Sequence, residues 1–250
     1  MPSTLVIVRH GESTWNKENR FTGWHDVSLT DEGERQATAA GHAMREAGLF
    51  FDVGHTSLQT RAVVTATLAL GALGQPWLPV QRSWRLNERH YGALQGLDKK
   101  ETTALHGAEQ TNLWRRSYDV PPPPVGTDSP EHPSHDPRYR LLPPDVLPAA
   151  ECLRDVVARV LPYWHDTIVP QLRSGLTVLV AAHGNSLRAL WKHLEGVSDT
   201  DIAELNIPTG FPRRYVFDDH LSVIEAAYLG DPDAAAKAAA AVAQQSRSSQ

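Results

Sequence analysis

The sequence contains a single cysteine, Cys152, in 250 residues. One cysteine cannot form an internal disulfide framework, and such scarcity is typical of proteins in a reducing compartment. Long apolar runs are missing too, and no basic stretch followed by an apolar segment opens the chain, so neither a membrane-spanning helix nor a secretion signal is expected. We therefore expect a cytoplasmic protein that does not associate with membranes.

Positive charge is also in short supply. The chain carries 24 Lys and Arg against 29 Asp and Glu, which gives a formal net charge of −5. This balance argues against a general nucleic-acid binder, although a locally basic pocket can still concentrate a small anion. With 41% hydrophobic side chains, the chain can bury a substantial core, and one α/β domain of this length is common.

Two stretches share one pattern, in which an apolar strand runs directly into His-Gly. Residues 5–8 lead into Arg9, His10 and Gly11, and residues 177–182 lead into His183 and Gly184. Such apolar runs are typical of strands buried on both faces, and ligands bind at the carboxyl ends of parallel strands. If the two strands are neighbours, both imidazoles reach one pocket, where a helix start supplies N–H groups to an anion. Either histidine alone remains compatible with an ordinary core role.

The rest of the chain alternates predicted strands and helices, which indicates an α/β fold. We expect a helix from Thr30 to Gly48, a strand at 50–56, a helix that begins at Ser57, and a further strand after Pro76. Further predictions are a helix over 98–117, a helix over 151–173 that Pro162 and Pro170 interrupt, a helix capped by Asn185 and Ser186, and a hairpin of 213–217 with 222–228.

Residues 118–148 hold ten of the eighteen prolines, four of them consecutive at 121–124. Proline lacks an amide donor and fixes φ, so this segment can form neither a regular helix nor a central strand. We expect an extended excursion across one face of the domain. A ligand for a proline-recognition domain is the alternative reading of this composition.

Four runs carry a family resemblance: Ile-Val-Arg-His-Gly-Glu-Ser at 7–13, residues 16–24, residues 86–97, and Ala-Ala-His-Gly-Asn-Ser-Leu-Arg-Ala-Leu at 181–190. They resemble the 2,3-bisphosphoglycerate-dependent phosphoglycerate mutases of the histidine phosphatase superfamily, and the likeness extends from Leu5 to residue 230. It implies a three-layer sandwich with a mostly parallel central sheet flanked by helices. One catalytic domain is expected over 1–230, followed by an Ala-rich tail over 231–250.

The resemblance also implies an activity. It is that of a glycolytic and gluconeogenic isomerase that interconverts 3-phosphoglycerate and 2-phosphoglycerate through a phosphohistidine, primed by 2,3-bisphosphoglycerate and without a metal. A homodimer or homotetramer is expected at the level of the family, whose tail tends to fold over the active site. The sequence departs from close family members at Arg213 and Arg214, where those have apolar residues, and this departure concerns an edge or a subunit contact.

The same resemblance assigns the site. His10 is the expected nucleophile and Glu88 the expected proton donor and acceptor. Arginine binds phosphate through forked hydrogen bonds, and Arg61, placed near a helix start, is expected to do so. Arg9, Arg61 and His183 are implied around the transferring group. Substrate contacts are implied for Asn16, Thr22, Gly23, Tyr91, Lys99, Arg115, Arg116, Gly184 and Asn185.

Three alternatives stay open at this point. A phosphatase of the same superfamily uses the same groups whenever water, rather than a hydroxyl, reaches the phosphohistidine. A non-catalytic phosphate sensor is a second reading, against which His10, Arg61, Glu88 and His183 together argue. A metal site built on the two histidines is a third, but the neighbouring arginines repel a cation and no carboxylate cluster completes the ligand set.

Overall fold

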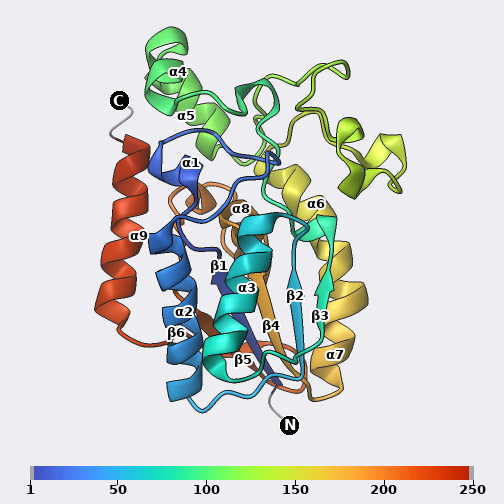
Figure 1. The fold of residues 1–250 in the computed structure, drawn as a ribbon, viewed down its shortest axis with the longest axis vertical. Coiled ribbons are helices and arrows are strands. Elements are labelled where there is room, and N and C mark those ends of the chain that lie inside the picture. The colour runs from blue at the N-terminus through green and yellow to red at the C-terminus, as the bar shows by residue number, and fades with distance from the viewer. Residues whose placement is uncertain (1–2, 248–250) are drawn as a thin grey trace.

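One six-stranded sheet organises the chain, whose residues 3–247 are described by the computed structural model (Figure 1). The strand order is β3-β2-β4-β1-β5-β6. The first four strands of this order are mutually parallel, while β5 runs antiparallel to both of its neighbours. The strands are β1 (Ser3–Arg9), β2 (Val53–Thr56), β3 (Val80–Arg82), β4 (Thr177–Ala182), β5 (Arg213–Phe217) and β6 (Val223–Tyr228).

Helices cover both faces of this sheet, so the expected three-layer sandwich is confirmed (Figure 1). On one face lie α2 (Asp31–Glu46) and α3 (Thr60–Leu73), which pack on Val6 and Val8 of β1. The opposite face carries α6 (Leu153–Tyr163), α7 (Val169–Arg173) and α8 (Gly184–Glu195). Because side chains alternate along a strand, β1 contributes to both cores, which is why its sequence is apolar without interruption.

Two predicted helix starts were wrong by a few residues. Helix α3 begins at Thr60 rather than Ser57, because residues 57–59 form the extended turn that leaves β2. Helix α8 begins at Gly184, with His183 as its N-cap, rather than after Asn185 or Ser186. Ser186 still serves this helix start, since its Oγ accepts a hydrogen bond from the His183 N–H at 3.1 Å.

Two predicted long helices are each divided. The segment over 98–117 forms α4 (Lys99–His106) and α5 (Ala108–Arg116), because Gly107 adopts a positive φ of 82° that no helix continues through. Between α6 and α7 the chain widens into a five-residue π-helix, Trp164–Ile168, flanked by Pro162 and Pro170. Each proline lacks the amide N–H that an α-helix needs. The predicted interruption is therefore confirmed, and it takes the form of a π-helix.

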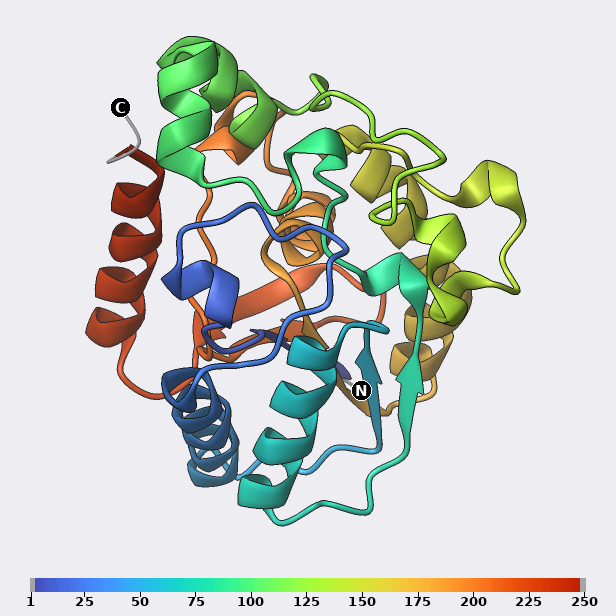
Figure 2. The same ribbon diagram turned by 45° about the horizontal axis from the view of Figure 1, so that its top comes forward.

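Most of the remaining elements lie near the carboxyl ends of the parallel strands (Figure 1). The proline-rich excursion contains three 3-10 turns, of which η4 (Pro137–Tyr139) is used below (Figure 2). Along one side of the molecule runs α9 (Pro232–Arg247). The division of the chain at residue 230 stays a prediction. The other short elements are α1 (Thr14–Lys17), η1 (Trp84–Leu86), η2 (Gly92–Leu94), η3 (Pro133–His135), η5 (Pro144–Val146) and η7 (Asp201–Ala203). Within residues 3–247, no helix is long and apolar enough to cross a membrane.

The loop after β1 touches α2 backbone to backbone. A Cβ added at Gly11 would lie 2.1 Å from the carbonyl oxygen of Gly33, and a Cβ added at Gly33 would lie 2.1 Å from that of Glu12. Side chains cannot occupy that space, so both positions require glycine. This contact fixes the distance between the first helix layer and the residues that follow His10.

Gly33→Ala should therefore destabilise the fold. Relief of the clash requires a backbone shift, and overpacking of this kind costs about 1–3 kcal/mol. Gly71→Ala in α3 is the matched control, because a Cβ there meets nothing within 4 Å and alanine is the better helix former by about 0.5–1 kcal/mol. Urea unfolding measures both changes. Equal stability of the two variants would contradict the close-contact argument.

Candidate active site

The two histidines of the His-Gly stretches lie side by side. Strands β1 and β4 pair in parallel with Arg9 opposite Ala182, and the His10 N–H donates to the Ala182 carbonyl at 2.9 Å. The imidazole rings of His10 and His183 have centroids 5.0 Å apart and are almost fully buried. The two strands are thus neighbours, which is the condition under which the sequence predicts that both imidazoles reach one pocket.

His10 is held in one tautomer. Its Nδ1 lies 2.7 Å from the carbonyl oxygen of Gly11. Because a carbonyl can only accept, Nδ1 carries the proton and Nε2 keeps its lone pair. Burial, together with the charges of Arg61 and Arg9, lowers the pKa of His10 well below its ordinary value. The imidazole is therefore neutral near pH 7, with Nε2 available as a nucleophile.

His183 is equally neutral but is held differently. Its Nε2 lies 2.7 Å from Ser57 Oγ, on the turn between β2 and α3. Burial first, then Arg61 and His10, lower the pKa of His183 well below its ordinary value. Its Nδ1 is buried and has no hydrogen-bond partner among the residues that the structure describes. A buried orphan of this kind indicates a polar group that a ligand can satisfy.

Two permanently charged guanidinium groups flank His10. Arg61 donates through Nη2 to the Gly23 carbonyl at 2.8 Å and through Nη1 to the His25 carbonyl at 3.1 Å. Arg9 donates through Nη1 to the Ile207 carbonyl at 2.7 Å. Burial lowers the pKa of Arg61 to about 10, against the opposing effect of Glu88 and Asp26, and lowers that of Arg9 as well. Both therefore stay charged at neutral pH.

Glu88 is the carboxylate of the site, and backbone donors hold it. Its Oε1 accepts from the Asn185 N–H at 3.0 Å, in the first turn of α8, and from the Arg89 N–H at 2.8 Å. The carbonyl of Glu88 accepts from Trp24 Nε1 at 2.6 Å. These bonds place a carboxylate beside the cationic groups, where it can give or take a proton.

A buried ion pair supports the backbone of this carboxylate. Arg159 Nε lies 2.6 Å from Glu151 Oε1, with side-chain exposures of only 6% and 4%. Arg159 Nη2 also donates to the carbonyls of Asn87 and Glu88 at 3.0 and 2.9 Å. Glu151 Oε2 accepts from the His90 N–H at 2.8 Å. The pair therefore holds the backbone both before and after Glu88.

A cleft of about 120 Å3 opens beside these groups. Four of the residues expected at the site do not form its walls: His10, Arg61 and His183 are buried next to it, and Gly23 contributes the carbonyl that Arg61 binds. The other expected residues all line it, namely Arg9, Asn16, Thr22, Glu88, Tyr91, Lys99, Arg115, Arg116, Gly184 and Asn185.

Several wall residues were missed by sequence reasoning. Arg188 lies one turn after Asn185 on α8, and its Nη1 donates to Asn185 Oδ1 at 2.9 Å. The three-residue spacing of Asn185 and Arg188 places both side chains on one face of the helix, and this is a signal in the sequence. The apolar pattern of the helix, however, predicts only its core face. The further wall residues carry no such signal: Arg20, Phe21, Leu205, Asn206, Ile207 and Val242. Val242 places the C-terminal helix α9 against the cleft.

These groups together suit the transfer of a phosphoryl group. A neutral imidazole nucleophile, charged guanidinium groups, a helix start and one carboxylate are what such a reaction needs without further covalent chemistry. Among the described residues no group of three or more His, Cys, Asp or Glu side chains is placed to hold a metal ion.

Comparison with known proteins identifies the family. The model of the histidine phosphatase superfamily (branch 1) matches residues 5–227. This chain belongs to the histidine phosphatase superfamily. Over 247 residues, which are 99% of this chain and 99% of the relative, the chain is 58% identical to a 2,3-bisphosphoglycerate-dependent phosphoglycerate mutase from Xylella fastidiosa (strain M12).

Solved structures of this superfamily fold are similar as well. A mycobacterial structure titled hydrolase 1 gives a TM-score of 0.68 at 22% identity, over 89% of this chain and 96% of that one. A putative alpha-ribazole-5'-P phosphatase from Escherichia coli gives a TM-score of 0.68 at 20% identity, over 92% and 97%. At these identities the likeness concerns the histidine phosphatase fold alone.

The buried pair beneath Glu88 yields a stability prediction. Arg159→Met leaves the Glu151 carboxylate buried without its partner, and breaking a buried pair in this way costs about 3–5 kcal/mol. Arg154→Met is the control, because Arg154 is exposed on the same helix. Urea unfolding compares the two variants. A loss below about 1 kcal/mol for Arg159→Met would mean that the pair does not support this region.

Proposed function

We propose that this protein is a 2,3-bisphosphoglycerate-dependent phosphoglycerate mutase, which interconverts 3-phosphoglycerate and 2-phosphoglycerate. The proposal is carried by a second cluster of cationic side chains in the cleft. This cluster comes from elements other than the strand that ends at His10. Lys99 from α4 and Arg115 and Arg116 from α5 line the same cleft as Arg9. A substrate with anionic groups at both ends matches this distribution, and the close relative with that name supports it.

The site residues fit the bisphosphate that primes such an enzyme. Arg9 Nε and Arg188 Nε, on two walls of the cleft, are buried and have no hydrogen-bond partner in the described part of the chain. Further N–H donors at two walls suit a ligand with several phosphate oxygens. 2,3-Bisphosphoglycerate supplies, when bound, the phosphoryl group that His10 accepts. We assign no metal to the reaction.

In the proposed mechanism His10 attacks phosphorus through Nε2. The P–N bond forms as the P–O bond of the ester breaks, and Glu88 gives the departing oxygen its proton. Arg9, Arg61 and His183, whose Nδ1 has no partner among the described residues, stabilise the negative charge on the three remaining oxygens, beside Asn16. In the return step Glu88 removes the proton from a substrate hydroxyl as that oxygen attacks the phosphohistidine.

Lys99, Arg115 and Arg116 have a separate role in this proposal. They hold the carboxylate and the second phosphate of the substrate, so that either of its two hydroxyl positions can meet His10. Tyr91 and Asn185 contact each other, since Asn185 Nδ2 lies 3.4 Å from the Tyr91 hydroxyl, and with Asn16, Thr22 and Gly23 they are assigned to substrate binding. We place the enzyme in the cytoplasm, in glycolysis and gluconeogenesis, as a homodimer or homotetramer.

The deciding experiment follows interconversion and free phosphate in one reaction. Purified protein is incubated with 3-phosphoglycerate in EDTA, with and without a trace of 2,3-bisphosphoglycerate, beside a His10→Ala control. We expect 2-phosphoglycerate to form, stimulated by the bisphosphate, with little release of phosphate, and the His10→Ala variant to be inactive. Release of phosphate without interconversion would make the protein a phosphatase. Loss of activity in EDTA that zinc restores would reject the reaction without a metal.

A pH dependence follows from two groups in the cleft. Burial, and then Arg115, lower the pKa of Lys99 to about 8. For Tyr91 burial alone would raise the pKa, but Arg89 and Lys99 outweigh it and bring the pKa to about 8. As the pH rises through 8, Lys99 loses a positive charge and Tyr91 gains a negative one. Both changes weaken the binding of an anion.

The kcat/KM of the enzyme should accordingly fall above about pH 8, because this ratio reports the pKa values of the free enzyme. The double variant Lys99→Arg with Tyr91→Phe keeps the positive charge and removes the phenol. Its profile should stay level to higher pH. An unchanged alkaline limb in the double variant would show that other groups control it.

A further inference from the structure

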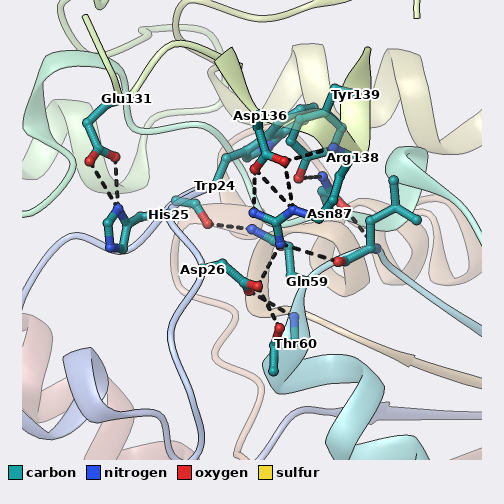
Figure 3. Close-up of polar contacts among 12 residues, drawn as sticks. Trp24, His25, Asp26, Gln59, Thr60, Asn87, Glu131, Asp136, Arg138 and Tyr139 are labelled. Atoms are coloured by element: carbon teal, nitrogen blue, oxygen red, sulfur yellow. Dashed lines mark hydrogen bonds and ion pairs between the residues drawn. The ribbon is translucent and has the colours of Figure 1, made fainter. Parts of the chain in front are cut away.

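An arginine of the proline-rich excursion reaches back to the loop that precedes α2. Arg138, in η4, lies with Nη1 2.7 Å from Asp26 Oδ2. Its Nε lies 3.0 Å from both carboxylate oxygens of Asp136, and its Nη2 also binds Asp136 (Figure 3). This fork orients the guanidinium group, so that Nη1 is directed at Asp26. Arg138 does not line the catalytic cleft.

Asp26 in turn caps the helix that carries Arg61. Gln59, the N-cap residue of α3, makes no side-chain capping hydrogen bond. Asp26, 34 residues before Thr60, takes over that role. Its Oδ1 accepts from the Thr60 N–H at 2.8 Å and its Oδ2 from Thr60 Oγ1 at 2.5 Å (Figure 3). A carboxylate at this position also complements the positive end of the helix dipole.

These contacts lead to Arg61, the residue after Thr60. Its guanidinium group donates to the carbonyls of Gly23 and His25, in the loop that leads to Asp26. Asp26 therefore fixes both the start of the helix from which Arg61 projects and the loop whose carbonyls its side chain binds. Movement of Asp26 shifts both ends of Arg61 together.

The proline-rich excursion also contacts the turn at residues 57–59, which leads into α3, at two further points. Arg138 Nη1 donates to the Leu58 carbonyl at 3.4 Å. Tyr139 accepts at its hydroxyl from Asn87 Nδ2 at 2.8 Å, and Asn87 Oδ1 accepts from the Leu58 N–H at 3.1 Å. Glu131 adds a contact to the loop, with both carboxylate oxygens 3.0 Å from His25 Nδ1 (Figure 3).

We propose that Arg138 is a positioning residue for phosphoryl transfer, which acts through Asp26 to hold Arg61 in place. The inference rests on the proposed function only in taking Arg61 as a ligand of the transferring group. Partly exposed ion pairs such as Arg138 with Asp26, with side chains 29% and 24% exposed, contribute little to stability. The loss of Arg138 should thus be seen in the kinetics and in phosphate binding more than in unfolding.

The test compares Arg138→Met with Arg140→Met. Arg140 is exposed and two residues further along the same segment, so its loss should leave activity unchanged. For Arg138→Met we expect kcat to fall about 10- to 100-fold, since small misplacements of a catalytic contact have effects of that size. The KM for 3-phosphoglycerate should change little, because Lys99, Arg115 and Arg116 are untouched. The melting temperature should stay close to that of the unmodified protein.

A double variant separates positioning from a general effect. In an Arg61→Ala background, Arg138→Met should cause no further loss of kcat, because the residue through which it acts is gone. A loss of the same size in both backgrounds would overturn the proposal. Asp26→Asn provides a second route should Arg138→Met fold poorly, since it removes the charge that binds Arg138 and leaves an oxygen for the Thr60 N–H. Its kcat should fall in the same way.

Binding of inorganic phosphate distinguishes failure of this inference from failure of the proposed function. The rise in melting temperature with phosphate concentration gives an affinity without any turnover. We expect about 10-fold weaker binding for Arg138→Met and for Asp26→Asn than for Arg140→Met. If the unmodified protein binds phosphate but interconverts no phosphoglycerate, the mutase is wrong and the affinities still test Arg138. Equal affinities and equal kcat values for Arg138→Met and Arg140→Met would reject the positioning role.

Discussion

The burial of several positive charges close together in one small cleft is the constraint to which the rest of the structure responds. Burial is the main cause that lowers the pKa values of Arg9, Lys99, Arg115, Arg116 and Arg188, and neighbouring cations add to it at the last four. Within the described walls of the cleft, Glu88 is the one acidic residue. A bound anion offsets the repulsion among these cations. Ligand binding therefore stabilises the folded protein.

The way these cations are held keeps their charge available. Arg9, Arg61 and Arg188 all donate to main-chain carbonyls, at Ile207, Gly23 and Ile202 respectively. A carbonyl satisfies the N–H groups of a buried guanidinium without neutralising it, whereas a carboxylate would satisfy and neutralise it together. Two ion pairs support the site from outside the cleft walls, Arg159 with Glu151 and Arg138 with Asp26. Supporting groups are thus paired with acids, and ligand-facing groups are bound to the backbone.

Local patterns in the sequence were sufficient for the strands of the sheet and for the strand ends at which the two histidines lie. An apolar run that ends in His-Gly predicts both the strand and the end at which the imidazole lies, but the sequence does not show that the two strands are neighbours, as β1 and β4 are. Local patterns failed where a distant residue decides. The start of α3 at Thr60 depends on Asp26, and Arg188 is held in the cleft by the carbonyl of Ile202. The break at Gly107 shows the same limit, because glycine is tolerated inside a helix until a positive φ is required.

The central strand also has a consequence for how the molecule is made. Strand β1 pairs with β4 and β5, whose residues lie more than 160 positions later in the chain. During synthesis at roughly 5–20 residues per second, the ~170 residues between His10 and His183 take about 10–30 s to emerge. Through that interval the ribosome carries an apolar strand with neither of its partners. The nascent chain is therefore open to aggregation for most of its synthesis, and no fragment that ends before β4 can bring His10 and His183 together.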